Sequence, residues 1–193
     1  MYQKFILYYF FLKNILLFKY HKITLGRKLR IRGSLKVIIK KEGKLKIGSN
    51  FNLTSGFMYN PLGRNIKSMI RVDEKAEIII GDNVGMSNVS LWSKKSIIIG
   101  NNVKIGADVL IFDSDMHALD YKLRREPNLD TNNAISKPIV ISDDVFIGTR
   151  CIVSKGVIIG ARSIIASGSV ITKSIPCDEI WGGNPVRFIK KSI

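Results

Sequence analysis

Residues 141–172 read ISDDVFIGTRCIVSKGVIIGARSIIASGSVIT, and this stretch decides the fold. An aliphatic residue recurs in it every six positions, at Ile141, Ile147, Val153, Ile159, Ile165 and Ile171. The residue after each of them is small or short, which suits neither an amphipathic helix nor a plain alternating strand. Short strands joined by tight corners would place each aliphatic side chain in a narrow core. The spacing therefore predicts an all-β protein built as a parallel β-helix.

The same pattern occurs earlier, in IGDNVGM from Ile80 and IGNNVKIGADVLI from Ile99, and more weakly in IGSNFNL from Ile47. It is interrupted over residues 118–140, where Arg124 and Asp130 are too large and charged for the small-residue position, so we expect a loop excursion there. Because stacked coils bury one another's faces, the two ends need caps. We therefore expect a helix over 1–22, a β-helix domain over 23–175 with loop 118–140, and a C-terminal tail over 176–193.

The charge of the chain is concentrated at its N-terminal end. Residues 1–50 hold 13 Lys and Arg and one acidic residue, so most of the formal net charge of +16 lies there. The apolar run within residues 1–22 is shorter than the roughly 20 residues that cross a bilayer, and no small-residue cleavage site for a signal peptide follows it. Residues 1–32 predict either a helix at the surface of anionic lipid or a helix packed on protein.

Other partners and ligands receive less support from the sequence. No helix-turn-helix, zinc-finger or aromatic RNA-binding pattern accompanies the basic segment, so we expect no nucleic-acid partner. The two cysteines, Cys151 and Cys177, form no metal-binding or disulfide pattern. We expect two free thiols, a reducing cytoplasmic environment and no metal.

Three features together resemble the hexapeptide-repeat acyltransferases: tandem aliphatic-Gly-x-x-x-x units, a loop beginning DSDMHALD, and the tail TKSIPCDEIWGGNPVRFIKK. Within that family the chain is most similar to O-acetyltransferases that modify sugars, such as galactoside and maltose acetyltransferases and those of bacterial polysaccharide pathways. The resemblance covers about residues 45–190. It implies a left-handed β-helix with three hexapeptides per coil, a homotrimer, and acetyl-CoA bound in clefts between neighbouring subunits.

His117 is the candidate general base. It stands six residues after Ile111, where the repeat ends, and it matches the histidine of the family's loop motif. A sugar hydroxyl is a poor nucleophile until a neutral imidazole accepts its proton. A carboxylate on the other ring nitrogen would fix the tautomer, and Asp115 and Asp113 are both candidates between which spacing does not choose.

The resemblance implies further site residues, each of which has an ordinary alternative as a turn or surface residue. Ser87 and Asn88 lie on the preceding coil, where the family stabilises the developing oxyanion. The pantetheine arm of CoA would lie along small residues at Gly148, Thr149, Ala166 and Ser167. Its phosphates would meet Thr172, Lys173, Arg187 and Lys190, where cations are favoured.

The predicted function is transfer of an acetyl group from acetyl-CoA to a sugar hydroxyl, in bacterial surface polysaccharide biosynthesis. We expect direct attack in a ternary complex, without an acyl-cysteine at Cys151, in the cytoplasm and at the inner face of the cytoplasmic membrane. The alternatives are N-acetylation of an amino sugar, O-acetylation of an antibiotic, and a β-helix scaffold without chemistry.

Overall fold

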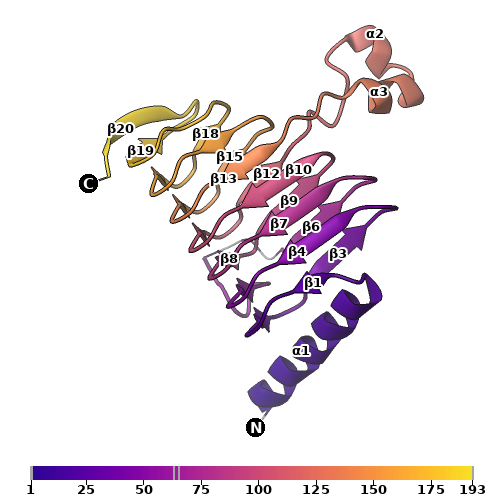
Figure 1. Ribbon diagram of the computed structural model, residues 1–193, viewed down its shortest axis with the longest axis vertical. Coiled ribbons are helices and arrows are strands. Elements are labelled where there is room, and N and C mark those ends of the chain that lie inside the picture. Colours follow the sequence, from indigo (N-terminus) through magenta and orange to yellow (C-terminus); the bar gives the residue numbers. More distant parts are fainter. Residues whose placement is uncertain (1, 63, 65, 193) are drawn as a thin grey trace.

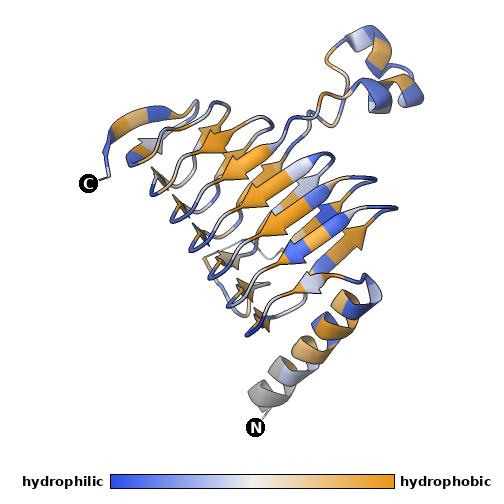
Figure 2. Ribbon diagram, in the orientation of Figure 1, coloured by the Kyte–Doolittle hydropathy of each residue, from blue (hydrophilic) through white to orange (hydrophobic). Residues whose placement is uncertain are grey.

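Three parallel sheets wind around one narrow core in the computed structural model, which describes residues 2–62, 64 and 66–192 (Figure 1). Each turn of the chain adds one strand to each sheet in the repeating register that is typical of a left-handed β-helix. The prediction of an all-β parallel β-helix with an N-terminal helix is therefore confirmed. Colouring by hydropathy shows mostly apolar strands toward the C-terminal end, and strands with alternating polar and apolar residues toward α1 (Figure 2).

The three sheets are named A, B and C in the order in which the chain visits them. Sheet A contains β1 (Thr24–Leu25), β4 (Lys44–Ile47), β7 (Glu77–Ile80), β10 (Ser96–Ile99), β13 (Ile139–Ile141) and β16 (Ile158–Ile159). Sheet B contains β2 (Arg30–Arg32), β5 (Asn52–Thr54), β8 (Gly85–Ser87), β11 (Lys104–Ile105), β14 (Phe146–Ile147), β17 (Ile164–Ile165), β19 (Glu179–Gly182) and β20 (Arg187–Lys191). Sheet C contains β3 (Lys36–Ile39), β6 (Met69–Val72), β9 (Ser90–Ser93), β12 (Leu110–Phe112), β15 (Ile152–Val153) and β18 (Val170–Ile171).

The six-residue period sets the register between coils. Ile105 pairs with Ile147, and Ile147 pairs with Ile165, so aliphatic side chains stack in a column inside sheet B. All three are buried. Each such side chain contributes roughly 1.5–3 kcal/mol by leaving water, and the columns of the three sheets together make the core.

The corners between sheets A and B explain why asparagine recurs in the repeat. Asn83 and Asn102 have φ of 59° in this corner, a left-handed conformation that asparagine tolerates better than most residues. The Asn83 amide nitrogen also donates to the Asn102 side-chain oxygen at 3.0 Å, and Asn50 donates in the same way to Asn83 at 2.9 Å. The corner is therefore held by a ladder of side-chain amides as well as by the strands.

Both ends of the β-helix are capped, as expected. Helix α1 (Tyr2–Tyr20) lies across the N-terminal end, where Phe18 is buried and the buried Asn14 amide donates to the Gly33 carbonyl at 3.0 Å (Figure 1). At the other end β19 extends sheet B in parallel with β17, and β20 returns antiparallel to it. No helix in the described part of the chain has an apolar stretch long enough to span a membrane.

Two segments leave the β-helix. The predicted excursion carries α2 (Tyr121–Arg124) and α3 (Pro127–Asn133), which stand clear of the coils before the chain returns at β13 (Figure 1). A second excursion, between β5 and β6, was not predicted. Its Tyr59 packs edge-on against Phe10 of α1, with ring centroids 6.5 Å apart, so this segment lies beside the N-terminal cap.

Candidate functional site

The excursion after β12 has a well-defined stem. Ser114 and Ser136 form an isolated antiparallel bridge, and the Asp115 amide donates to the Ile135 carbonyl at 3.0 Å. The chain therefore leaves and rejoins the corner between sheets C and A at adjacent points. We refer to residues 113–137 as the His117 loop.

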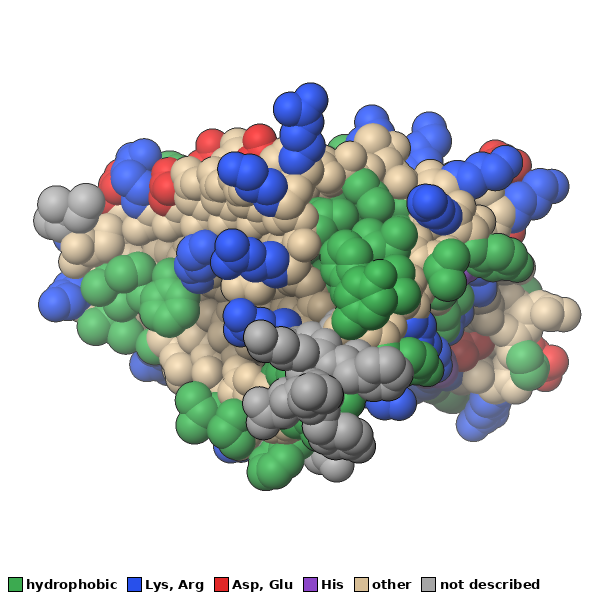
Figure 3. Space-filling view, turned by 90° about the horizontal axis from the view of Figure 1, so that it is seen from below, with side chains coloured by type: hydrophobic (Ala, Val, Ile, Leu, Met, Phe, Trp, Pro, Cys, Tyr) green, Lys and Arg blue, Asp and Glu red, His purple; other side chains and the backbone are tan. Residues whose placement is uncertain are grey.

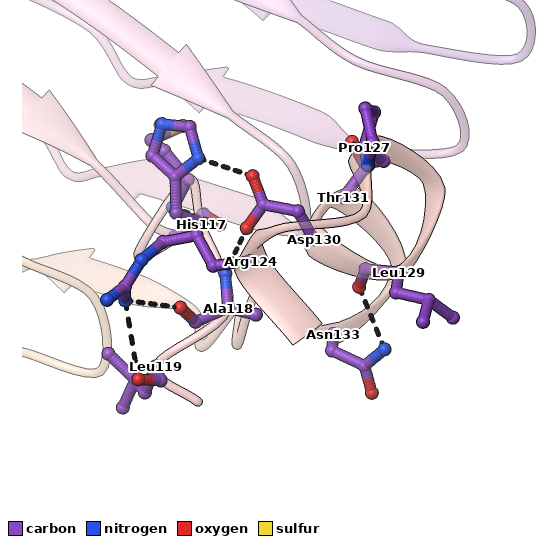
Figure 4. Close-up of polar contacts among 11 residues, drawn as sticks. His117, Ala118, Leu119, Arg124, Pro127, Leu129, Asp130, Thr131 and Asn133 are labelled. Carbon is purple, nitrogen blue, oxygen red and sulfur yellow. Dashed lines mark hydrogen bonds and ion pairs between the residues drawn. The ribbon is translucent and has the colours of Figure 1, made fainter. Parts of the chain in front are cut away.

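His117 lies in this loop against a carboxylate supplied by α3 (Figure 4). Its Nδ1 is 2.6 Å from Oδ2 of Asp130. The imidazole is 67% exposed, whereas the Asp130 side chain is 14% exposed. An ionised carboxylate can only accept, so the neutral ring carries its proton on Nδ1 and leaves the lone pair of Nε2 open to a substrate.

Asp130 is itself held in place by the loop backbone. Its Oδ1 accepts from the Ala118 amide at 2.7 Å, and Arg124 donates to the Ala118 carbonyl at 2.8 Å. The hydrogen bond from His117, assisted by that of the Ala118 amide, lowers the pKa of Asp130 below its usual range. Asp130 therefore stays ionised near neutral pH and can stabilise an imidazolium beside it.

Asp113 does not contact the imidazole, contrary to expectation. It is buried, and its carboxylate accepts from the Ser93 hydroxyl and from three successive backbone amides, those of residues 94–96, at 2.7–2.8 Å. These bonds hold the corner between β9 and β10, so the role of Asp113 is structural.

Asp115 is also directed away from His117. Its Oδ1 lies 2.5 Å from Nζ of Lys155, on the next coil. The expectation that Asp115 or Asp113 orients the imidazole is therefore wrong, because both carboxylates have other partners. The residue that does so, Asp130, gave one signal in the sequence: a charged side chain at a repeat position that otherwise takes small residues.

The two candidates for oxyanion stabilisation differ in their surroundings. Asn88 is buried, and its Oδ1 accepts from the Gly56 amide at 2.7 Å, so it holds the start of the second excursion. A side chain without exposed surface cannot contact an acceptor in this conformation. Ser87 is partly exposed and shares a hydrogen bond with the Thr54 hydroxyl, and it remains the candidate of the two.

Four of the predicted CoA residues do gather at one place. Gly148, Thr149, Ala166 and Ser167 lie at successive levels of the corner between sheets B and C, and the Thr149 amide donates to the Ser167 hydroxyl at 3.1 Å. A Cβ built on Gly148 would lie 2.6 Å from the Ser167 backbone nitrogen. The coils therefore stack closely here, and because none of the four residues has a long side chain we call this place the slim corner.

The remaining four predicted CoA residues are divided between two elements. Thr172 and Lys173 follow β18, and the Lys173 ammonium lies 5.0 Å from the centre of the Trp181 ring. Arg187 and Lys190 lie on β20, and both are exposed. All four are near the C-terminal end of the β-helix, and Trp181, beside Lys173, is tied to the slim corner because its carbonyl accepts from the Ala166 amide at 2.8 Å.

His117 and the slim corner lie at different edges of sheet C. The His117 loop leaves from the edge of sheet C that adjoins sheet A, whereas Gly148 and Ser167 lie at the edge that adjoins sheet B. Within one chain, a strand of sheet C therefore separates the imidazole from the slim corner.

The cysteines show no sign of nucleophilic activation. Cys151 is buried, its thiol lies 3.2 Å from the Ala166 carbonyl, and burial raises the pKa of the thiol. A nucleophilic cysteine needs the opposite shift. Cys177 is exposed. Over residues 2–62, 64 and 66–192, no cluster of three or more His, Cys, Asp or Glu is arranged to hold a metal ion.

Comparisons with known proteins agree with this architecture. The family model described as "Bacterial transferase hexapeptide (six repeats)" matches residues 138–173. WbbJ of Escherichia coli (strain K12), named for O-acetyl transfer in lipopolysaccharide biosynthesis, is 28% identical over 157 residues, covering 79% of this chain and 74% of WbbJ.

The chain is also similar, at slightly higher sequence identity, to an acetyltransferase whose structure has been solved. The hexapeptide-repeat containing acetyltransferase VCA0836 of Vibrio cholerae is 30% identical, with a TM-score of 0.54, over 81% of this chain and 74% of that chain. VCA0836 from Vibrio cholerae O1 biovar eltor has also been solved in complex with acetyl coenzyme A; that chain is 27% identical, with a TM-score of 0.45, over 88% and 71% of the two chains.

Proposed function

Because the chain belongs to the hexapeptide-repeat acetyltransferase family, we propose that it transfers the acetyl group of acetyl-CoA to a sugar hydroxyl, with His117 as the general base. The observation that carries the proposal is the hydrogen bond of 2.6 Å between His117 Nδ1 and Asp130. An exposed imidazole that is fixed by a carboxylate is suited to accept a proton from a hydroxyl.

In the proposed reaction the acceptor hydroxyl gives its proton to Nε2 of His117 while its oxygen attacks the thioester carbonyl. The tetrahedral intermediate then collapses as its C–S bond breaks, and the imidazolium returns the proton to the departing CoA thiolate, which leaves as free CoA. Asp130 holds the Nδ1 proton and stabilises the imidazolium that forms. A positioned general base of this kind accelerates a reaction by about 10²–10⁴-fold. Transfer is direct, because the buried Cys151 thiol is not placed to form an acyl-enzyme.

Acetyl-CoA would supply the activated thioester. The slim corner around Gly148, Thr149, Ala166 and Ser167 fits the pantetheine arm, since no long side chain of these residues blocks it. Thr172, Lys173, Arg187 and Lys190 are exposed and are proposed to contact the phosphates. Membership of the hexapeptide-repeat acetyltransferase family supports this donor.

A homotrimer is proposed because one chain does not bring its two halves of the site together. The imidazole and the slim corner lie at opposite edges of sheet C. Packing one subunit against the next around a threefold axis would place the His117 loop of one beside the slim corner of its neighbour. The active site would then belong to a pair of subunits.

The proposed acceptor is a glycan of a bacterial surface polysaccharide. Support comes from the similarity to WbbJ, which is named for lipopolysaccharide biosynthesis. We further propose that the protein works in the cytoplasm at the inner face of the membrane, which the apolar and basic N-terminal segment supports.

Free thiol release from acetyl-CoA tests the proposal against a panel of sugars, amino sugars and hydroxyl-bearing antibiotics. We expect release to depend on a sugar hydroxyl and to fall by about 10²-fold or more in His117→Ala. The matched control is His21→Ala, which removes the other histidine, located in the N-terminal segment. Equal acceptor-dependent rates in wild type and His117→Ala would contradict the assignment, and release that requires an amine would indicate N-acetylation.

A further inference from the structure

Helix α1 is apolar on both of its faces. Its inner face packs on the β-helix through Phe18, while its outer face presents large side chains that are 41–82% exposed: Tyr8, Tyr9, Phe11, Leu12, Leu16 and Tyr20. A helix that is apolar all round is normally covered on every side. The rest of the chain covers only the inner side of α1, so we expect its outer face to contact an apolar environment outside this chain.

The second excursion adds to this exposed face. Phe57, Met58 and Leu62 are 55–76% exposed at its tip, and the excursion is joined to α1 through the contact between Tyr59 and Phe10. Seen from the α1 end of the molecule, hydrophobic surface is flanked by lysine and arginine side chains (Figure 3). We call this region, formed by the outer face of α1 and residues 57–62, the α1 surface.

Two grooves beside the α1 surface supply positive charge, and Tyr20 lines both. The first, of about 540 Å³, is lined in part by Lys13, Lys36 and Lys67. The second, of about 480 Å³, is lined in part by Lys22, Lys40, Lys44 and Lys46. Among the residues that the structure describes, no acidic side chain lines either groove.

These lysines are largely available to an external anion. Among the described residues, Lys40 alone of the seven is in an ion pair, with Asp73 at 3.4 Å. Concentrated positive charge beside exposed aromatic and aliphatic side chains is the combination that binds anionic bilayers: apolar groups enter the headgroup boundary and cations meet the phosphates. A nucleic acid would satisfy the lysines but would leave the apolar face in water.

We propose that the α1 surface docks onto an anionic phospholipid bilayer, with α1 lying in the plane of the membrane. The inference rests on the membrane location proposed above, and it does not depend on the acetyl-transfer chemistry. In the proposed homotrimer, parallel β-helices would present three α1 surfaces on the same side, so that weak individual contacts would add. The His117 loops would then be held at a fixed height above the membrane.

Vesicle cosedimentation of the full chain tests the charge component. We expect binding to vesicles of phosphatidylglycerol and phosphatidylcholine, and little binding to phosphatidylcholine alone. The variant Lys13→Gln/Lys36→Gln/Lys67→Gln should lower the partition coefficient by about 10²-fold, because each lysine near the surface contributes about fivefold. The control Lys122→Gln/Arg125→Gln/Arg150→Gln removes the same charge far from α1 and should bind as wild type does.

A second variant, Leu12→Ser/Leu16→Ser/Tyr20→Ser, tests the apolar component, and it changes exposed side chains only. We expect it to lose vesicle binding while keeping its subunit number in light scattering and its thiol release with a soluble acceptor. Wild-type protein that binds neither kind of vesicle would overturn the proposal, as would a lower subunit number in this variant, which would make the surface an interface between copies. Thiol release measured on the same samples distinguishes a failure of the membrane proposal from a failure of the proposed acetyl transfer.

Discussion

The Asp115 carboxylate lies 2.5 Å from the ammonium nitrogen of Lys155, and this ion pair joins the stem of the His117 loop to the next coil of the β-helix. Both side chains are largely buried. The Gly156 amide, next to Lys155, donates to the Lys137 carbonyl at 3.2 Å and ties the other half of the stem to the same corner. The stem of the loop is therefore fixed to a rigid element two residues before His117, the proposed general base.

Breaking this ion pair should slow catalysis without weakening donor binding. We expect Lys155→Met to lower kcat by up to about 10²-fold, because small displacements of a catalytic group cost that much, while the KM for acetyl-CoA stays unchanged. The control is Arg162→Met, which breaks the equally short ion pair with Asp178 at another corner. Thiol-release kinetics measure both, and a loss of kcat of the same size in the control would show that the effect is general destabilisation.

Asp130→Asn should separate orientation of the imidazole from general folding. We expect kcat/KM to fall by about 10²-fold or more because the imidazolium loses its carboxylate, while the KM for acetyl-CoA and the midpoint of chemical denaturation stay close to those of wild type. Asp120→Asn is the matched control in the same loop, where Asp120 accepts from the Lys122 amide at 2.8 Å and caps α2. A loss of kcat/KM of the same size in Asp120→Asn would show that the effect is not specific to the contact between Asp130 and His117.

Asp113→Ala should affect stability and leave the chemistry intact. The substitution leaves the Ser93 hydroxyl and three backbone amides without their acceptor, and each buried unsatisfied group costs about 1–3 kcal/mol. Chemical denaturation should show a clear loss of unfolding free energy, whereas kcat per folded molecule should not change. Asp143→Ala, which removes a more exposed cap from the Asn101 amide, should cost less. A selective loss of kcat in Asp113→Ala would restore Asp113 as a site residue.

The ion pair between Arg162 and Asp178 predicts a pH dependence of stability. The hydrogen bond from Arg162 lowers the pKa of Asp178 below its ordinary value of 3.8. The stabilisation is therefore complete above pH 3.8 and is lost as the pH falls through the lower folded-state value. Thermal unfolding should show a Tm difference between wild type and Asp178→Asn that is constant near neutral pH and disappears in acid. A difference that persisted at the acid end would mean that the ion pair is not its source.

The parts of the molecule that follow from local periodicity could be predicted, and those that depend on tertiary contacts could not. The stacking of Ile105, Ile147 and Ile165 follows directly from a six-residue period, and the end of that period located the His117 loop. Asp130 was missed because it reaches His117 only after α3 has folded back over thirteen residues of chain. Asp113 and Asp115 were expected because they precede His117 closely in the sequence, but Asp113 is buried at the corner between β9 and β10 and Asp115 pairs with Lys155.

The second excursion was missed for a related reason. It has no periodic pattern, and its place beside α1 depends on a contact between Phe10 and Tyr59, which are far apart in the sequence. The basic N-terminal segment was recognised from composition, but composition could not show that one face of the helix would cap the β-helix while the other remained exposed.

The bridge between Ser114 and Ser136 means that the whole His117 loop is inserted at a single point of an otherwise continuous scaffold. On either side of the insertion the ladders are unbroken, with Ile99 paired to Ile141 and Ile111 paired to Val153. The segment between the two serines can therefore vary in length and composition during evolution while the coils remain the same. For engineering, a replacement loop between these two positions would have to keep the contact between His117 and Asp130, while the support beneath it would not need redesign.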